Sequence, residues 1–232
     1  MDPLFIIIIG GGFLFSFAVQ QTLKRTFAKW SRVPNTLRAP GATIARRILD
    51  DNELTRVPVT KAKGQLSDHY DPSNPTIRLS REIYEVPSVA SMAVAAHEAG
   101  HALQDADDYG PMELRTYLAP VASLGARFGV PLAFIGIFLG IPRLVQIGML
   151  GYVGALGLQF VTLPVEFNAS RRALRQLRKL GLEGEEEVAT KKVLRAAAMT
   201  YVAGVASAAG YIVYVAVAGV RAVWSRPRPP VS

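Results

Sequence analysis

The chain alternates between long apolar blocks and charged stretches. Residues 4–23, 117–141, 144–163 and 196–223 form apolar blocks of at least 20 residues, each with at most one charged side chain. A helix of roughly 20 residues crosses a hydrocarbon core about 30 Å thick. The pattern therefore predicts a mainly α membrane protein with about four transmembrane helices.

The first block, taken with its start as residues 1–23, is predicted to be a retained transmembrane anchor. A cleavable signal peptide begins with basic residues. Here Asp2 is acidic, and the basic residues Lys24 and Arg25 follow the apolar block instead. We therefore expect this helix to stay in the mature protein.

The polar stretch 24–116 carries the signals of a small α+β domain. Residues 42–54 have the apolar spacing of a helix, and residues 88–104 form a second helical segment rich in Ala and Val. Three short strand candidates lie between them, at residues 55–60, 65–70 and 76–79.

The rest of the chain is divided by proline and by charge. Residues 117–163 are predicted to form a transmembrane hairpin. Pro164 is predicted to begin a separate basic helix, within a segment 164–195 that also holds an acidic linker. Residues 196–224 are the last predicted span, and the proline-rich residues 225–232 are typical of a disordered tail.

Composition and charge narrow the classes of function. The chain has no Cys, which excludes disulfides, thiolate metal sites and iron–sulfur clusters. The net charge is +8, but the basic residues flank the apolar blocks and no aromatic nucleic-acid platform accompanies them. This distribution favours a lipid bilayer as partner and argues against nucleic acid.

One motif carries the chemistry: His97-Glu98-Ala99-Gly100-His101, inside the Ala-rich helix. Histidines four residues apart lie on one helical face, so both imidazoles can bind the same ion. Glu98 lies beside such an ion without binding it, where a general base is needed. A coincidental pair of buried histidines is the alternative, but it would leave costly polar groups in an apolar segment.

A hydrolytic zinc site needs a third protein ligand and one open position. Glu166 and His69 are the two candidates. Glu166 is favoured because two histidines and a glutamate are an established hydrolytic set. Its alternative role is a first-turn glutamate stabilised by the helix dipole. His69 would otherwise be a strand histidine or a donor to the transition state.

Together these residues resemble the membrane-bound neutral zinc metallopeptidases of the YugP-like type, within the gluzincin group. The resemblance rests on the first span, on residues 66–72, on the helix 95–104 and on residues 163–172. It implies a zincin-like catalytic domain that carries the His-Glu-x-x-His helix. It also implies a single Zn²⁺ ion held by His97, His101 and Glu166, with Glu98 as catalytic base.

The resemblance is incomplete at one position. Gluzincins often carry an Asp four residues after the ligand glutamate, where it orients a zinc histidine. Here Ser170 occupies that position and Asn168 is the nearest amide. These two residues are the candidates to orient a ligand histidine.

The implied reaction is hydrolysis of peptide bonds in a protein or peptide substrate by a metal-activated water, with Glu98 as general base. Further donors to the substrate or transition state are sought among His69, Tyr70, Arg171 and Arg172. Two alternatives remain. The motif helix could itself span the bilayer, as in an intramembrane site-2-type protease, or zinc could only stabilise a non-catalytic scaffold.

Topology gives the expected location. Two spans separate the motif from Glu166, so both lie on the same side of the membrane. Residues 24–115 hold 13 basic residues and residues 171–195 hold eight, which makes that side cytoplasmic by the positive-inside rule. The arginines after residue 220 argue for the opposite orientation. The membrane is expected to be the plasma (inner) membrane of a bacterium.

Overall fold

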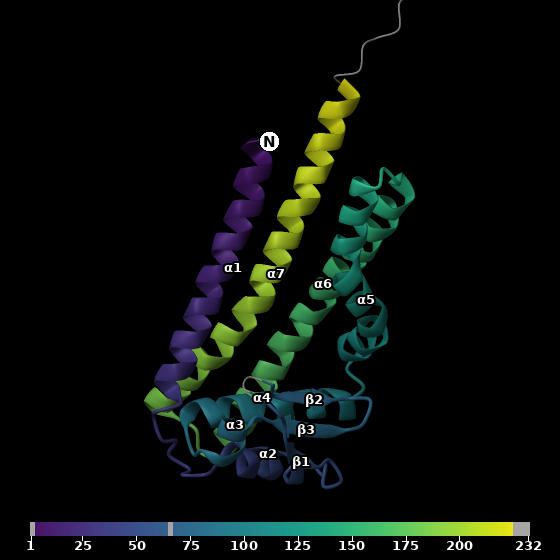
Figure 1. Cartoon of the computed structure of the whole chain (residues 1–232). Helices are drawn as coiled ribbons and strands as arrows, with labels where there is room; N and C mark the ends of the chain where they lie inside the picture. Colours follow the sequence, from purple (N-terminus) through teal and green to yellow (C-terminus); the bar gives the residue numbers. More distant parts are fainter. Residues whose placement is uncertain (1–2, 65–66, 225–232) are drawn as a thin grey trace, which may run out of the picture.

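In the computed structural model, four long helices stand on a small α+β base (Figure 1). The structure describes residues 3–64 and 67–224, so the predicted tail at 225–232 lies outside the described residues. The long helices are α1 (Pro3–Trp30), α5 (Gly110–Phe138), α6 (Pro142–Lys179) and α7 (Gly184–Trp224). The base holds α2 (Gly41–Asp50), α3 (Arg81–Glu85), α4 (Val89–Ala106), β1 (Val59–Lys61), β2 (His69–Asp71) and β3 (Thr76–Leu79).

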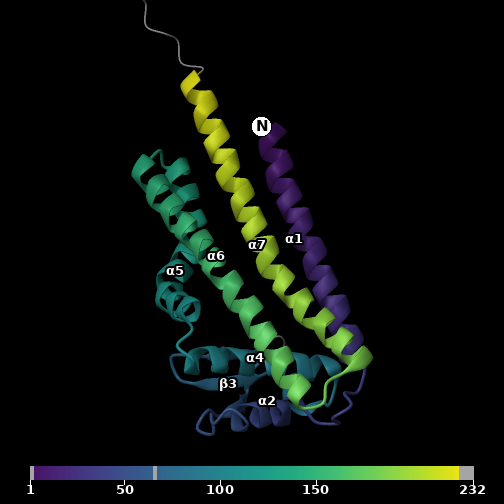
Figure 2. The same ribbon diagram turned by 180° about the vertical axis from the view of Figure 1, so that it is seen from behind.

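The four long helices are each long and apolar enough to cross a membrane. The path of the chain is seen from both sides in Figures 1 and 2. Helix α1 runs down to the base, α5 rises from it, α6 returns to it and α7 rises again. The base therefore lies at one end of the helices, as an even number of crossings between the motif and Glu166 requires.

The prediction that Pro164 begins a new helix is wrong. Helix α6 runs without interruption from Pro142 to Lys179, with Pro164 inside it. A proline removes one backbone donor, but a membrane helix packed against neighbours tolerates this loss. Helix α1 likewise continues past residue 23 to Trp30, so the anchor extends into the base as one helix.

The sheet is small and mixed, in the order β1-β3-β2. Strand β1 pairs parallel to β3, and β2 pairs antiparallel to β3, with Tyr70 opposite Ile77. The predicted strand 76–79 is confirmed. Strand β1 overlaps the predicted strand 55–60 only at residues 59–60, and β2 overlaps the predicted strand 65–70 at residues 69–70, while residues 65–66 lie outside the described residues. The side chain of Arg46 binds the carbonyl oxygens of Leu54 and Val57, at 2.9 and 2.6 Å, and so holds the segment before β1 as a loop.

The apolar core of the base lies between α2, the sheet, α4 and the lower end of α6. Its largest fully buried side chains include Ile44, Ile77, Met92 and Leu177. Ser88 caps α4, because its hydroxyl accepts a 3.0 Å hydrogen bond from the N–H of Ser91. The motif helix is thus fixed at its start and packed on several sides.

The predicted hairpin of α5 and α6 is packed through glycine. A Cβ atom added to Gly129 would lie 2.7 Å from the carbonyl oxygen of Gly148, so the two backbones touch. Such close contact is typical of helix pairs in membranes. Helices α1 and α7 form a second pair, in which the hydroxyls of Ser16 and Ser207 lie 3.3 Å apart.

Candidate metal centre

The two motif histidines lie together on one face of α4. Their ring centroids are 4.7 Å apart and the ring planes meet at 82°. His101 is buried and His97 is half-buried. The helical spacing alone accounts for this pairing, as the sequence predicts.

Glu166 of α6 reaches both histidines. Its Oε2 lies 3.1 Å from Nε2 of His97, and its Oε1 lies 3.7 Å from Nε2 of His101. One ligand atom from each of the three residues falls within 4.8 Å of the other two. Two ligands of a tetrahedral zinc ion lie about 3.3 Å apart at the usual bond length. The two separations from Glu166, 3.1 and 3.7 Å, are close to this value, so the three groups could hold one such ion after a small adjustment.

Gly100 allows α6 to come this close. A Cβ atom at Gly100 would lie only 2.5 Å from the carbonyl oxygen of Ala169. The backbone of α6 therefore rests directly on α4 at Gly100, next to His101 in the sequence. A larger residue would push Glu166 away from them.

Gln104 fixes the protonation pattern of His101. Its Nε2 donates hydrogen bonds to the carbonyl oxygen of Val165 at 2.8 Å and to Oδ1 of Asn168 at 3.1 Å. Its Oε1 must therefore face Nδ1 of His101, 2.9 Å away, and only a protonated Nδ1 can donate to it. The Nε2 atom of a neutral His101 then carries the lone pair that a metal requires.

Ser170 makes the corresponding contact with His97. Its hydroxyl oxygen lies 3.2 Å from Nδ1 of His97, while Nε2 of the same ring faces Glu166. The two orienting candidates from the sequence thus have different positions: Ser170 contacts a motif histidine directly, whereas Asn168 contacts Gln104.

The negative charge of the centre is not fully compensated, which favours a bound cation. Oε1 of Glu166 is buried and, among the described residues, no donor reaches it with hydrogen-bond geometry, although Arg115 lies 3.3 Å away. Burial lowers the pKa of His97, but its hydrogen bond to Glu166 and the charges of Glu98 and Glu166 outweigh burial and raise it. A divalent ion would supply the positive charge that these groups attract.

Glu98 is positioned by the sheet. The backbone N–H of Tyr70 donates a 2.9 Å hydrogen bond to Oε2 of Glu98, which is 7% exposed. The phenol of Tyr70 instead donates to Oδ2 of Asp105, at 2.7 Å. Burial and this hydrogen bond raise the pKa of the phenol, which therefore stays protonated.

His97, Glu98 and Glu166 face a cavity of about 450 Å³, which is lined by β2, α4, α5, α6 and α7. His97, Glu98, His101 and Glu166 line it together. His69 lies at its exposed rim, with Nδ1 2.7 Å from the carbonyl oxygen of Ser67. The cavity thus joins the edge of the sheet to the inner faces of the long helices.

The two predicted arginines lie elsewhere. Arg171 is exposed and does not line this cavity. Arg172 binds Oδ1 of Asn168 at 2.8 Å and pairs with Asp107, so it supports the Gln104 network from outside. Arg115 of α5 is the arginine that lines the cavity.

Sequence reasoning missed Gln104, Arg115 and Tyr201 of α7, the last of which also lines the cavity. Gln104 could have been found, because it lies three residues after His101 and so on the same face of the helix. Arg115 and Tyr201 give no such local signal, because each approaches the centre from a separate helix.

Comparison with known proteins gives a consistent result. The family described as "Putative neutral zinc metallopeptidase" matches residues 5–219. The chain is 42% identical over 202 residues to the "Putative membrane protease YugP" of Bacillus subtilis (strain 168), which covers 86% of this chain and 89% of that protein. No solved structure matches the chain. The match over almost the whole length shows that the chain belongs to this family of neutral zinc metallopeptidases.

Proposed function

We propose that this protein is a membrane-bound zinc endopeptidase that hydrolyses peptide bonds, with Glu98 as general base and one zinc ion held by His97, His101 and Glu166. The observation that carries the proposal is the Gln104 contact. It turns the lone pair of His101 toward Glu166, so the donor set suits a divalent ion before any ion is bound.

The metal would supply Lewis-acid chemistry, polarising the attacking water and the scissile carbonyl. The protein supplies the proton transfers. Glu98 accepts the proton of the water and then returns it to the leaving amine. The N–H of Tyr70 holds one oxygen of Glu98 in place, at 2.9 Å, which leaves the other oxygen for the reaction.

Arg115 adds a positive charge on the α5 side of the cavity. Its guanidinium lies 3.3 Å from Glu166 and is only partly buried. We infer that it donates to the carbonyl oxygen of the substrate, a role for which His69 at the rim is the second candidate. A preorganised donor of this kind stabilises the charge that develops on that oxygen.

Strand β2 offers a binding edge for an extended substrate. It is an outer strand of the sheet. The N–H of Tyr70 on its outer edge donates to Glu98, so a substrate would pair with other backbone groups of this edge and lie beside the proposed base. His69 and Tyr70, both on β2, line the cavity. We infer that a protein substrate lies along this edge in extended form. The base, with the lower part of α6, would then act as a zincin-like catalytic domain of the gluzincin type.

The expected location remains part of this proposal: the plasma (inner) membrane of a bacterium, with the base on the cytoplasmic side. The intramembrane alternative is less well supported. Helix α4 is not one of the four candidate spans found among the described residues, and it lies across the lower ends of the long helices (Figure 1).

The test compares Glu98→Gln with Glu166→Ala in full-length protein purified in detergent. Glu98→Gln should keep one bound zinc by elemental analysis and lose cleavage of casein. Glu166→Ala should lose zinc as well as cleavage. Glu113→Gln, which neutralises an exposed carboxylate of α5 outside the cavity, is the matched control and should change neither property.

The same pair of variants separates the proposal from a zinc-stabilised scaffold. A structural site uses four protein ligands and needs no base beside the metal. Unchanged casein cleavage by Glu98→Gln, in preparations where Glu166→Ala abolishes cleavage, would refute the mechanism. Cleavage that no variant affects would come from a contaminating protease.

A further inference from the structure

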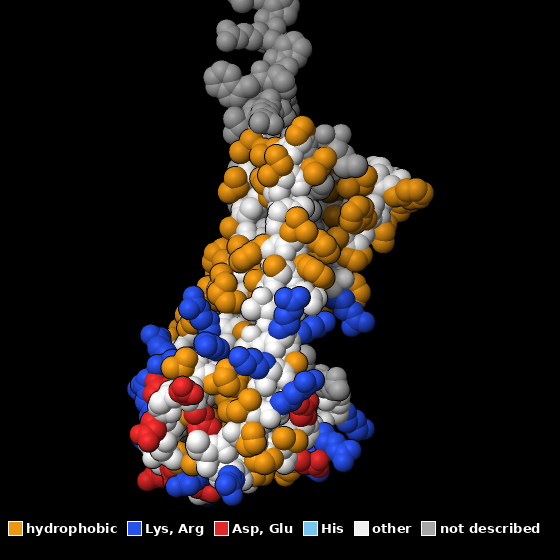
Figure 3. Space-filling view, turned by 90° about the vertical axis from the view of Figure 1, so that its left-hand side faces the viewer, with side chains coloured by type: hydrophobic (Ala, Val, Ile, Leu, Met, Phe, Trp, Pro, Cys, Tyr) orange, Lys and Arg blue, Asp and Glu red, His pale blue; other side chains and the backbone are white. Residues whose placement is uncertain are grey.

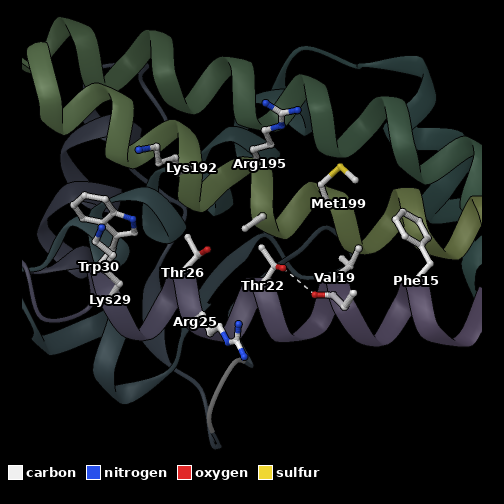
Figure 4. Close-up of a pocket in the computed structure, with 12 residues that line it drawn as sticks. Phe15, Val19, Thr22, Arg25, Thr26, Lys29, Trp30, Lys192, Arg195 and Met199 are labelled. Carbon is white, nitrogen blue, oxygen red and sulfur yellow. Dashed lines mark hydrogen bonds between the residues drawn. The ribbon is translucent and has the colours of Figure 1, made fainter.

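A second cavity, of about 630 Å³, lies between α1 and α7. It is distinct from the catalytic cavity, because none of the described residues lines both. Figure 4 shows its arrangement: Trp30 lies at one end, Phe15 and Met199 lie at the other, and Thr22 and Thr26 lie between them. We call it the α1–α7 groove.

One end of the α1–α7 groove is basic and the other is apolar. Lys29 and Lys192 lie toward the Trp30 end, and Arg25 and Arg195 lie nearer the middle (Figure 4). Phe15, Val19 and Met199 lie toward the other end, and Ala18 and Ala196 complete the apolar lining. No aspartate or glutamate of the described residues lines it. A ligand that fits both ends must be anionic at one end and hydrocarbon at the other.

The cations of the groove lack protein counter-ions. Within the described part of the chain, no carboxylate forms an ion pair with Arg25, Lys192 or Arg195. The adjacent residue Lys191 differs, because its ammonium lies 2.5 Å from Glu187. Cations without carboxylate partners can donate charge-assisted hydrogen bonds to phosphate oxygens.

The groove also lies at the level of a membrane surface. Figure 3 shows Lys and Arg gathered in a belt at the lower edge of the apolar surface, on the side where α1 lies. Trp30 in the groove is the residue type that membrane interfaces favour. From Lys29 to Phe15, α1 rises about 21 Å, which is enough for a headgroup and much of an acyl chain in one leaflet about 15 Å deep.

We propose that the α1–α7 groove binds one anionic phospholipid. Its phosphate lies against Lys29, Lys192 and Arg195, and one acyl chain lies along Phe15, Val19 and Met199. The lipid would join α1 to α7, the helix that brings Tyr201 to the catalytic cavity. This proposal does not depend on the proposed function, because it concerns neither the metal ligands nor Glu98.

Lipid binding can be measured on full-length protein purified in detergent with its metal. The probes are phosphatidylglycerol, phosphatidylcholine with the same acyl chains, and inorganic phosphate. Native mass spectrometry counts retained lipid, and thermal unfolding gives the affinity. The wild type should retain one phosphatidylglycerol and prefer it to phosphatidylcholine, and inorganic phosphate should have no effect.

Two variants probe the two ends of the groove. Lys192→Gln/Arg195→Gln should weaken phosphatidylglycerol binding about 30-fold. Each cation near an anionic lipid contributes about 1 kcal/mol, and about 2 kcal/mol corresponds to that change in affinity. Ala18→Trp keeps every charge but fills the acyl end, and should weaken both lipids. Arg47→Gln/Arg56→Gln removes two exposed charges from the base and is the matched control.

The proposal is overturned if the control pair weakens lipid binding as much as the groove pair, because diffuse charge would then explain the binding. Stabilisation by inorganic phosphate alone would also overturn it, as would equal affinity for the two lipids. So would a cross-link from residue 18 to a second copy of the chain in lipid-containing membranes, because the groove would then hold protein.

Discussion

Replacing Gln104 by leucine is the sharpest test of how the metal centre is oriented. The substitution keeps a side chain of similar volume but removes three hydrogen bonds. These are the contacts with Nδ1 of His101 at 2.9 Å, with the carbonyl oxygen of Val165 at 2.8 Å and with Asn168 at 3.1 Å. His101 is then free to take the other tautomer or to turn.

The expected size follows from what each partner loses. The Nδ1–H of His101 is buried and would lack its partner. The carbonyl oxygen of Val165 would lose the bond from Gln104, but it lies inside α6 and keeps the donor that the helix itself supplies. Asn168 keeps its 2.8 Å hydrogen bond from Arg172. One unsatisfied buried donor costs about 1–3 kcal/mol in the free energy of unfolding. Losing the group that orients a metal ligand weakens metal binding about 10- to 100-fold.

The assay is a competition for zinc between the protein and a chromophoric chelator, in detergent, with thermal unfolding measured in parallel. Gln176→Leu is the matched control. It removes a single 2.9 Å hydrogen bond, from Gln176 of α6 to Asn52, far along the helix from the metal centre. It should lower stability and leave the zinc affinity unchanged. If Gln104→Leu binds zinc as tightly as the wild type, the orienting role is wrong.

Three further outcomes are expected. Gly100→Ala should lower zinc affinity and cost about 1–3 kcal/mol in stability, because its Cβ would lie 2.5 Å from an α6 carbonyl oxygen. Chelator competition measures the affinity and thermal unfolding measures the stability. An unchanged zinc affinity would show that the close approach of α6 to Gly100 does not position Glu166. Hydrogen bonds from Lys61 and Arg81 lower the pKa of Glu85 below 4.5. The wild type should therefore be more stable than Glu85→Gln above pH 4.5, and this difference should fade as the pH falls through the lowered pKa of Glu85. Melting temperatures measured against pH check this, and a difference that stays constant would refute it. Zinc at about 100 times its Kd should stabilise the protein by about 2.7 kcal/mol, and a chelator should reverse this gain in thermal unfolding.

The local part of the site could be predicted from sequence and the rest could not. His97 and His101 meet because residues four apart on a helix share a face, which no tertiary contact needs to arrange. Glu166 is 65 residues further on and reaches them only through the packing of α6 on Gly100. The spacing therefore left His69 open as a third ligand, and only the fold brings Glu166 to both rings.

The four apolar blocks correctly predict the four long helices, because a helix that crosses a bilayer needs about 20 consecutive apolar residues and few other structures show such a run. Pro164 misled the prediction. In soluble proteins a proline often marks the first turn of a helix. Here the apolar helix before Pro164 continues through it and carries Glu166 to the histidines. The roles of Gln104 and Arg115 depend on what lies opposite them, which one sequence does not reveal.

Because α6 is continuous, assembly of the candidate metal centre depends on the long helices being made and packed. Glu166, Arg115 and Tyr201 of the cavity come from helices that are long and apolar enough to cross a bilayer. A soluble fragment ending before α5 would keep the motif and still lack Glu166. A newly made chain therefore cannot bring Glu166 to His97 and His101 until α5 and α6 have been made and α6 has packed on α4.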